Sequence, residues 1–309
     1  MKILHSFDEL YDNEGSAVTV GKFDGLHMGH EKLVEKIVNK KSEGLRSIVV
    51  TFERMSDNTI LKKSDKLLMT KEEKETLFAH SGVDILLELP FDRHLMQMRA
   101  DLFVKNLSEK LHMKYLIVGD DFHFGYKGAG NTGLLQELSD VFGYEVDVIK
   151  KIQYEDAVVS STRVRNEIKN GNIELANDLL GHPYFLIGKI IHGNQIGSTK
   201  IGRPTINIQP SDDKLLPPNG VYVTKVEMTG RIFHGVTNIG LRPTIIEEIK
   251  HINVETHILD FNNNVYDNYA RVMFFSFLRP EMKFENLGEL SKQIENDIHT
   301  TYIYFNQKK

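Results

Sequence analysis

In the first half of the chain, short apolar runs alternate with longer segments whose apolar residues recur at helical spacing. The short β-branched runs indicate buried strands, and apolar residues three and four positions apart indicate helices that bury one face. The predicted strands are 17–20, 47–52, 85–89, 115–118 and 145–149. The predicted helices between them are 30–42, 71–81, 100–111 and 132–142. Strands joined by helices of this length predict a parallel sheet covered on both faces, with ligands at the carboxyl ends of its strands.

The second half of the chain has a different pattern, in which helical spacing gives way to strand-like runs. Residues 184–192 form an apolar run without helical period, and residues 254–261 alternate between apolar and polar side chains. This alternation places Glu255 and His257 off the core face. Residues 274–277, Phe-Phe-Ser-Phe, are typical of a strand with core phenylalanines.

Composition limits the classes of protein to which the chain can belong. Its 309 residues are enough for two domains, and 40% hydrophobic and 26% charged residues are typical of a soluble globular protein. The absence of cysteine excludes disulfides, thiolate metal sites and cysteine nucleophiles. The net charge of −5 gives no general reason to bind nucleic acid, and no run of about 18 apolar residues predicts a membrane span. The N-terminus does not resemble a secretory signal, so we expect a cytoplasmic protein without nucleic-acid or membrane partners.

The most informative segment is 18–30, Val-Thr-Val-Gly-Lys-Phe-Asp-Gly-Leu-His-Met-Gly-His. An apolar strand is followed by glycines that allow a tight turn, and then by His27 and His30 at the start of an amphipathic helix. A helix N-terminus suits phosphate because it presents free N–H groups and the positive end of its dipole. Gly29 lets a nucleotide approach the backbone, and the imidazoles can donate to phosphate oxygens. The alternative is that both histidines are ordinary helix-start residues.

Two further polar segments follow predicted strands. Asp120 and Asp121 end the fourth strand, and Phe122 and Phe124 after them offer flat apolar surface for a ring system. The alternative there is a polar loop with two core phenylalanines. After the fifth strand, residues 160–165 are Ser-Ser-Thr-Arg-Val-Arg, and hydroxyls with arginines at a helix start can hold phosphates. The alternative for this segment is a plain helix cap with solvent-facing arginines.

A glycine-rich stretch, 193–207, follows the first strand-like run of the second half. Thr205 and Asn207 are two positions apart, so their side chains share a face in an extended chain. A hydroxyl and an amide oxygen are hard ligands suited to Mg²⁺ held with ATP phosphates. The spacing is not that of a Walker A loop, because no Gly-Lys-Ser/Thr is present. By its pattern alone, Glu255 is also compatible with a solvent-facing strand carboxylate.

The segment 18–30 resembles the nucleotidyltransferases related to class I aminoacyl-tRNA synthetases. The order of all these segments, with Ala-Asn-Asp-Leu-Leu-Gly-His-Pro-Tyr at 176–184, resembles the prokaryotic bifunctional riboflavin kinase/FMN adenylyltransferases over essentially the whole chain. The resemblance implies an α/β nucleotidyltransferase domain with a Rossmann-like parallel sheet at 1–183. It also implies a riboflavin kinase β-barrel domain with a C-terminal helix at about 287–301, the whole domain spanning 184–309. The first domain would convert FMN and ATP to FAD and pyrophosphate, and the second would phosphorylate riboflavin to FMN with ATP.

The resemblance also implies roles for individual residues. The implied catalytic residues are His27, His30, Arg163 and Glu255, the last as general base on the ribityl hydroxyl. The implied nucleotide-binding residues are Gly21, Phe23, Asp24, Gly29, Asp121, Ser161, Thr162, Gly197 and Gly202. The implied flavin-binding residues are Phe122, Phe124, Asn131 and Arg242, and the implied ligands of Mg²⁺ are Thr205 and Asn207. We expect a monomer or a weak homo-oligomer that takes ATP, riboflavin and FMN.

The chain departs from the family pattern at a few positions, and these leave alternatives open. Arg54-Met55-Ser56 replaces the usual Pro-His-Pro, and His123 stands where an arginine is usual. In the kinase loop, Arg203 replaces an aromatic residue and Ser198 replaces an arginine. One alternative is therefore that a single activity is retained, FMN adenylyltransferase alone being favoured over kinase alone. The others are a flavin- or nucleotide-binding regulator without turnover, and an RNA-linked enzyme, which the acidic charge balance disfavours.

Overall fold

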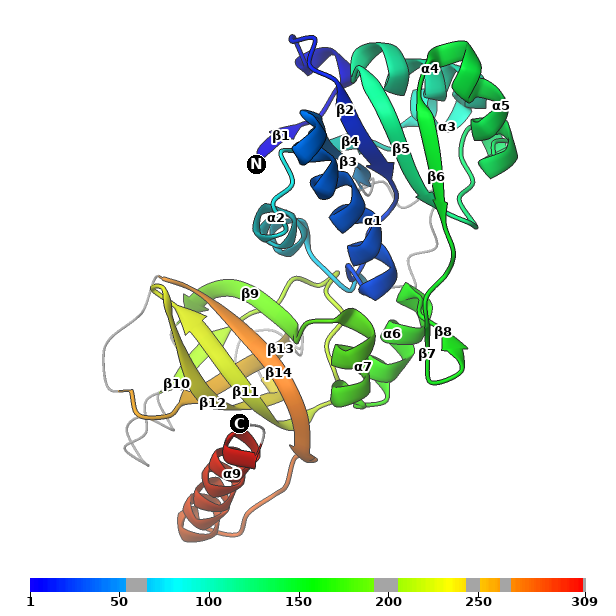
Figure 1. The fold of residues 1–309 in the computed structure, drawn as a ribbon. Coiled ribbons are helices and arrows are strands. Elements are labelled where there is room, and N and C mark those ends of the chain that lie inside the picture. The colour runs from blue at the N-terminus through cyan, green and yellow to red at the C-terminus, as the bar shows by residue number, and fades with distance from the viewer. Residues whose placement is uncertain (54–65, 192–204, 243–250, 262–267, 308–309) are drawn as a thin grey trace. The chain divides into compact units, whose positions relative to one another are not determined.

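The computed structural model describes residues 1–53, 66–191, 205–242, 251–261 and 268–307 (Figure 1). The chain forms two compact units, the first being Met1–Asp65 with Lys71–Ser161 and the second Lys66–Thr70 with Thr162–Lys309. This division by packing differs from the predicted domain boundary after residue 183, because it places residues 162–183 with the second unit. The domain boundaries at 1–183 and 184–309 stay a prediction.

The first unit is built on a six-stranded sheet in the order β1-β4-β3-β2-β5-β6, in which all neighbouring strands are parallel. Its strands are β1 (Lys2–Leu4), β2 (Ser16–Val20), β3 (Arg46–Glu53), β4 (Ile85–Pro90), β5 (Met113–Gly119) and β6 (Glu145–Ile149). The five predicted strands are confirmed to within two residues at each end. The sequence analysis missed β1, which pairs with β4 at the edge of the sheet.

Helices cover both faces of this sheet, as predicted. They are α1 (Met28–Asn39), α2 (Lys71–His80), α3 (Arg93–Gln97), α4 (Ala100–Lys110) and α5 (Thr132–Phe142), with short 3-10 turns at Phe7–Glu9, Lys40–Glu43 and Tyr126–Gly128. Figure 1 shows α1 on one face of the sheet and α4 and α5 on the other. Strands β7 (Gln153–Tyr154) and β8 (Ala157–Val158) form a separate hairpin. On the α4/α5 face, one apolar core includes Val18, Val20, Ile48, Val50, Phe103, Val104 and Leu107.

The second unit contains a closed six-stranded antiparallel barrel in the order β10-β13-β12-β11-β14-β9. Its strands are β9 (Tyr184–Ile191), β10 (Thr205–Ile208), β11 (Gly220–Met228), β12 (Arg231–Arg242), β13 (His251–Ile258) and β14 (Tyr269–Arg279). Its helices are α6 (Ser161–Lys169), which begins at the last residue of the first unit, α7 (Ile173–Leu180) and α9 (Leu287–Gln307). The predicted barrel and C-terminal helix are confirmed.

The C-terminal helix α9 is longer than the predicted 287–301 because its last turns pack on the barrel. The Phe305 ring stacks on the His234 imidazole, with centroids 4.2 Å apart, and meets Phe275 edge-on at 5.3 Å. The Asp297 carboxylate accepts from the Arg279 guanidinium of β14 at 2.8 Å. Aromatic stacking and a largely buried ion pair therefore fix α9 to the outside of the barrel.

A short segment from the middle of the sequence of the first unit belongs to the second unit. The Leu67 N–H donates to the Asp213 carbonyl oxygen at 2.7 Å, and the Leu215 N–H donates to the Leu67 carbonyl oxygen at 2.8 Å. The Lys214 side chain is 1% exposed, and its ammonium donates to the Leu68 carbonyl oxygen at 2.8 Å. It also lies over the Tyr184 ring at 4.4 Å, so the buried cation is surrounded by a carbonyl and an aromatic face.

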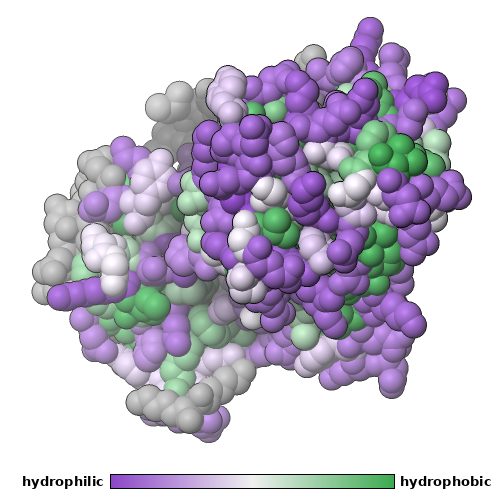
Figure 2. Space-filling model, turned by 45° about the horizontal axis from the view of Figure 1, so that its top comes forward, coloured by the Kyte–Doolittle hydropathy of each residue, from purple (hydrophilic) through white to green (hydrophobic). Residues whose placement is uncertain are grey.

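Hydrophilic side chains cover most of the surface in view in Figure 2, and apolar side chains appear there in small separate groups. Among the helices that the structure describes, none combines the length and apolar character needed to cross a membrane.

Three threonines form a hydrogen-bonded chain in the interior of the barrel. The Thr237 hydroxyl lies 2.7 Å from that of Thr224 and 2.8 Å from that of Thr256, and all three side chains are fully buried. Replacing Thr237 by valine keeps the shape but leaves two buried hydroxyls without their shared partner. We expect the substitution to lower the free energy of unfolding by about 1–3 kcal/mol.

The measurement is urea unfolding of Thr237→Val, followed through the transition of the barrel unit. Thr300→Val is the matched control, because Thr300 is exposed on α9 and bonds only within its own helix. Equal stability of the two variants would contradict a stabilising role for the threonine chain.

Candidate functional site

The turn between β2 and α1 holds its backbone in an unusual conformation. Phe23 has φ of +47° and Leu26 has φ of +44°, in the left-handed region that disfavours apolar side chains, and Gly25 between them has φ of +95°. Phe23 is fully buried and Leu26 is 2% exposed. The Phe23 ring meets the Phe78 ring of α2 edge-on at 5.5 Å and the His30 ring at 5.1 Å. Burial of two apolar side chains therefore holds a strained turn in one conformation.

This turn delivers two histidines to the N-terminus of α1. His27 is the N-cap, and its Nδ1 accepts from the His30 backbone N–H at 3.4 Å. The two imidazoles stack with centroids 3.8 Å apart and an angle of 15° between their planes. A Cβ atom at position 29 would lie 3.3 Å from the His27 ring, so Gly29 leaves room for this stack. Because Nδ1 of His27 accepts, the neutral ring carries its proton on Nε2 and can donate it to a ligand.

Both histidines are neutral at physiological pH. Burial lowers the pKa of His27 to about 4. His30 is partly exposed, but its Nδ1 atom is buried and has no hydrogen-bond partner among the described residues. Desolvation lowers the pKa of His30 well below its ordinary value. The stacked pair therefore offers N–H donors rather than positive charge, and the free N–H groups of α1 lie beside it.

Other predicted nucleotide-binding residues of the first unit lie on the same turn or at neighbouring strand ends. The Gly21 N–H donates to the Val50 carbonyl oxygen at 3.0 Å, and the Ser161 hydroxyl donates to the Asp24 carbonyl oxygen at 2.7 Å. Asp121 lies at the end of β5 and is exposed; its negative charge counteracts part of the pKa lowering of His27. These residues are thus brought to the carboxyl edge of the sheet, where such sheets bind ligands.

The predicted flavin-binding residues of the first unit take part in structural contacts. Phe122 and Phe124 stack with centroids 5.3 Å apart, but Phe124 is only 7% exposed within the apolar core and Phe122 packs against it. Asn131 caps α5, its Oδ1 accepting from the Leu134 N–H at 3.0 Å. Phe122 therefore has the more accessible ring of the two.

The other predicted phosphate-binding residues, Thr162 and Arg163, lie in the first turn of α6. They fall in the second unit, which resumes at Thr162, whereas Ser161 is the last residue of the first unit. Thr162 is exposed and Arg163 is half-exposed.

A second group of polar side chains lies on the barrel strands β10 and β13. The Thr205 hydroxyl donates to Oε1 of Glu255 at 2.8 Å, and Asn207 lies directly opposite Glu255 in the strand pairing. Asn207 is 3% exposed, and its Oδ1 accepts from the Asn253 amide at 2.7 Å. Its Nδ2 is buried and finds no hydrogen-bond partner in the part of the chain that the structure describes. The structure thus brings together the three residues that the sequence predicts for phosphoryl transfer, and adds Asn253.

Some predicted residues lie outside the part of the chain that the structure describes. Gly197 and Gly202 are among them, as are the departures from the family pattern at 54–56, Ser198 and Arg203. The backbone of Arg242 ends β12, but its side chain is outside the description. His123, the remaining departure, is exposed, and its Nδ1 lies 2.9 Å from the Asp121 carbonyl oxygen.

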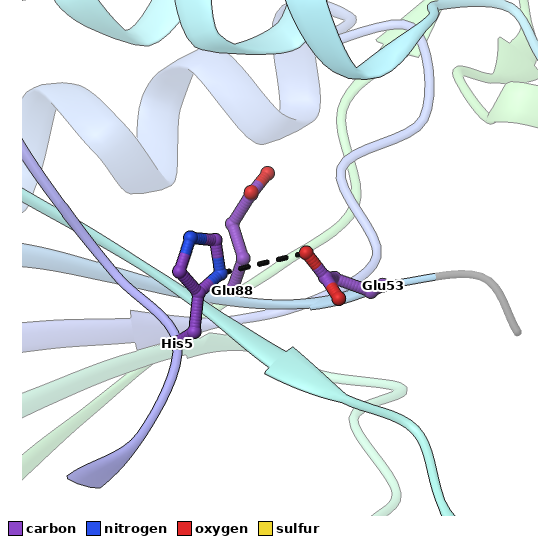
Figure 3. Close-up of side chains that lie close together, drawn as sticks. All are labelled: His5, Glu53 and Glu88. Atoms are coloured by element: carbon purple, nitrogen blue, oxygen red, sulfur yellow. Dashed lines mark ion pairs between the residues drawn. The ribbon is translucent and has the colours of Figure 1, made fainter. Parts of the chain in front are cut away.

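A cluster of His5, Glu53 and Glu88 brings potential metal ligands to within 4.8 Å of one another at the same sheet edge. Figure 3 shows their side chains converging, with an ion pair of 3.4 Å between His5 and Glu53. The Lys71 ammonium, however, lies 2.7 Å from Glu53 and 2.9 Å from Glu88, and these contacts raise the pKa of Lys71. Lys71 thus supplies the positive charge that a metal would bring, and we assign no metal site here.

Sequence reasoning missed two polar residues at the candidate sites. Asn253 precedes Glu255 by two positions on β13, so the alternation that identified Glu255 also places Asn253 on that face. Lys74 lies on α2, and its Nζ donates to the Lys22 carbonyl oxygen at 3.1 Å, within the β2–α1 turn. No sequence signal distinguishes it from the other charged residues of α2.

Comparison with known proteins gives concordant results. A family model for FAD synthetase matches residues 10–163, and one for riboflavin kinase matches residues 180–305. Proteins named bifunctional riboflavin kinase/FMN adenylyltransferase are similar over nearly the full length. The one from Haemophilus influenzae is 37% identical over 95% of both chains, and the one from Escherichia coli is 33% identical over 100% of this chain and 99% of its own.

Among solved structures, one described as a macrolide-efflux protein from Streptococcus pneumoniae is similar in fold. It superposes with a TM-score of 0.86 and 27% sequence identity, over 97% of this chain and 98% of that one. The two-unit architecture, with a parallel sheet followed by a barrel, thus recurs in a solved structure.

The neutral state of His27 predicts that acid destabilises the first unit. The unfolded chain takes up a proton on His27 near pH 6.5, but the folded protein does so only near pH 4, so the unfolded state holds more protons between these values. The free energy of unfolding therefore falls as the pH falls through this window. We expect His27 to account for about 2 kcal/mol of the loss between pH 7.5 and pH 5.

Urea unfolding of the unmodified protein and of His27→Asn at both pH values measures this term. Asparagine offers a side-chain oxygen acceptor in place of the capping Nδ1 but does not titrate, so the variant should lose about 2 kcal/mol less than the unmodified protein. His299→Asn, at an exposed position on α9, is the control. The same pH dependence in His27→Asn and in the unmodified protein would contradict the assignment.

Proposed function

This chain belongs to the bifunctional riboflavin kinase/FMN adenylyltransferase family, and we propose that the two clusters described above carry its two activities. It is a transferase that phosphorylates riboflavin with ATP to give FMN, and adenylylates FMN with ATP to give FAD. Both domains match their family models, which favours the bifunctional enzyme over a single activity or a regulator without turnover. The observation that carries the site assignment is the neutral, stacked His27–His30 pair at the N-terminus of α1.

We assign adenylyl transfer to the His27–His30 pair of the first unit. An oxygen of the FMN phosphate attacks the α-phosphorus of ATP, a new P–O bond forms, and the bond to the bridging oxygen breaks, releasing pyrophosphate with the electron pair. The Nε2–H of His27 and the N–H groups of α1 donate to the phosphate oxygens as their charge grows. Because the stacked rings are fixed by Phe23 and by the helix cap, these donors need little reorganisation.

The remaining first-domain assignments extend this arrangement. Gly21, Phe23, Asp24 and Gly29 form the turn that approaches the nucleotide, and Asp121 borders it. Ser161, Thr162 and Arg163 hold the triphosphate, with Arg163 counted among the catalytic residues. Phe122, Phe124 and Asn131 are assigned to the flavin.

We assign phosphoryl transfer to the barrel cluster. Glu255 takes the proton from the ribityl hydroxyl of riboflavin as its oxygen attacks the γ-phosphorus of ATP. The Thr205 hydroxyl holds one oxygen of this carboxylate at 2.8 Å and thereby fixes its orientation. Gly197, Gly202 and Arg242 complete the nucleotide and flavin contacts of this domain.

Mg²⁺ fits the donor set of the barrel cluster. Thr205 and Asn207 offer a hydroxyl and an amide oxygen, beside the Glu255 carboxylate, and all are hard oxygen ligands. The Asn207 Oδ1 accepts from the Asn253 amide and keeps a second lone pair for the metal. The Nδ2 of the same amide is an N–H donor, which suits a phosphate oxygen rather than Mg²⁺. When bound, Mg²⁺ would neutralise charge on the ATP phosphates.

The remaining assignments concern the setting of the enzyme. The domains divide at 183/184, the protein is cytoplasmic, and it acts as a monomer or weak homo-oligomer on small molecules, without nucleic-acid or membrane partners.

Two variants should separate the activities. His27→Asn should reduce FAD formation from FMN by about 100-fold, because a phosphate donor is lost, and leave FMN formation from riboflavin unchanged. Glu255→Gln keeps the acceptor for Thr205 but removes the base, so it should reduce FMN formation by about 10²–10⁴-fold and leave FAD formation intact. The measurement is chromatography of flavins after incubation with ATP and Mg²⁺, with riboflavin or FMN supplied separately. If either variant lost both activities or neither, that site assignment would be wrong.

A metal titration tests the assignment of Mg²⁺ to the barrel. Thr205→Val keeps the shape of the side chain but removes the hydroxyl ligand. We expect the Mg²⁺ concentration for half-maximal riboflavin phosphorylation to rise about tenfold, while that for FAD formation stays the same. An unchanged Mg²⁺ requirement for the kinase would exclude Thr205 as a ligand.

A further inference from the structure

Lys74 is a charged side chain of the first unit that the mechanism above does not use. It lies on α2 one turn before Phe78, whose ring packs on Phe23, so both α2 residues face the β2–α1 turn. Its Nζ donates to the Lys22 carbonyl oxygen at 3.1 Å and lies 3.4 Å from the Thr51 hydroxyl oxygen. These contacts hold the ammonium against the backbone that leads to His27 and use two of its three donors, leaving one for a ligand.

Among the described residues, no carboxylate pairs with the Lys74 ammonium. Lys71, one turn earlier on α2, pairs with Glu53 at 2.7 Å and Glu88 at 2.9 Å. Within the part of the chain that the structure describes, Lys74 has no such ion pair, and Asp24 and Glu88 act on it only at longer range. Desolvation accordingly lowers the pKa of Lys74. A partly desolvated cation without a paired anion is costly in the empty site and is relieved when an anion binds.

A polyphosphate bound at His27 and His30 needs a positive charge that these two residues do not supply. His27 and His30 are neutral and donate hydrogen bonds, but they do not offset the negative charges of a polyphosphate. The Lys74 charge is one of the causes that lower the pKa of His30, so the ammonium lies within electrostatic range of that imidazole. Lys74 is also only half-buried, so a ligand can reach it.

We propose that the Lys74 ammonium binds a phosphate of the nucleotide at the His27–His30 site and supplies the positive charge that the two histidines lack. This inference rests on the proposed function of that site. The competing role is structural: Lys74 only connects α2 to the Lys22 carbonyl. That role requires a hydrogen-bond donor but no charge.

The test compares Lys74→Gln, Lys74→Met and Lys110→Met in the full-length protein. Glutamine keeps N–H donors for Lys22 and Thr51 but removes the charge, whereas methionine removes both. We expect both Lys74 variants to lose about 100-fold in kcat/KM for FAD formation from FMN and ATP. Lys110→Met, on α4 of the same unit, breaks an ion pair between exposed side chains and should change this value little. FMN formation from riboflavin, measured in the same preparations, should be unchanged. The urea unfolding transition of the first unit reports that each variant is folded.

Each other outcome overturns the inference in a distinguishable way. Activity of Lys74→Gln near that of the unmodified protein would show that a donor suffices, and hence that the role is structural. A loss of the unfolding transition of the first unit in Lys74→Gln would show that Lys74 supports the fold. Failure of the unmodified protein to form FAD from FMN would overturn the proposed function of the first unit, and this inference with it.

Discussion

Burial of the Phe23 ring is the constraint on which the first site depends. The ring packs edge-on against Phe78 and His30, and so fixes a turn in which Phe23 and Leu26 have positive φ. Such a conformation costs of order 1–3 kcal/mol per residue and persists only where surrounding contacts determine it. The same turn places His27 as the cap of α1, which fixes the tautomer of its imidazole. An apolar contact thus decides where polar donors point.

The two sites differ in how their buried polar side chains compensate for the loss of water. In the first unit, water is removed from two imidazoles, which become neutral donors. In the barrel, the Thr205 hydroxyl and the Asn253 amide satisfy Glu255 and Asn207 through hydrogen bonds between neighbouring strands. The first arrangement suits a reaction that needs a positioned substrate and N–H donors. The second arrangement suits a reaction that needs a carboxylate base with an oriented oxygen.

The sequence predicted the parallel strands because burial of both sheet faces leaves continuous apolar runs. It placed Glu255 on the polar face of a strand because apolar and polar side chains alternate over residues 254–261. It did not predict β1, because three residues are too few for a period to show. Nor could it predict Lys74, whose importance depends on the turn that α2 packs against rather than on neighbours in sequence. Lys214 was missed because a fully buried lysine contradicts the usual preference of that residue for the surface. Recognition of the family supplied the flavin, which spacing alone did not.

The segment 66–70 has a consequence for how such a chain can be divided. Lys214 buries its charge against a carbonyl of Leu68, a residue that precedes it by 146 positions. A fragment that begins at residue 162 or 184 would keep the buried ammonium but lose this acceptor, together with the backbone pairing of Leu67. A single cut before the barrel would therefore leave a buried positive charge without its acceptor. A barrel excised in this way should be less stable than the same barrel in the full chain.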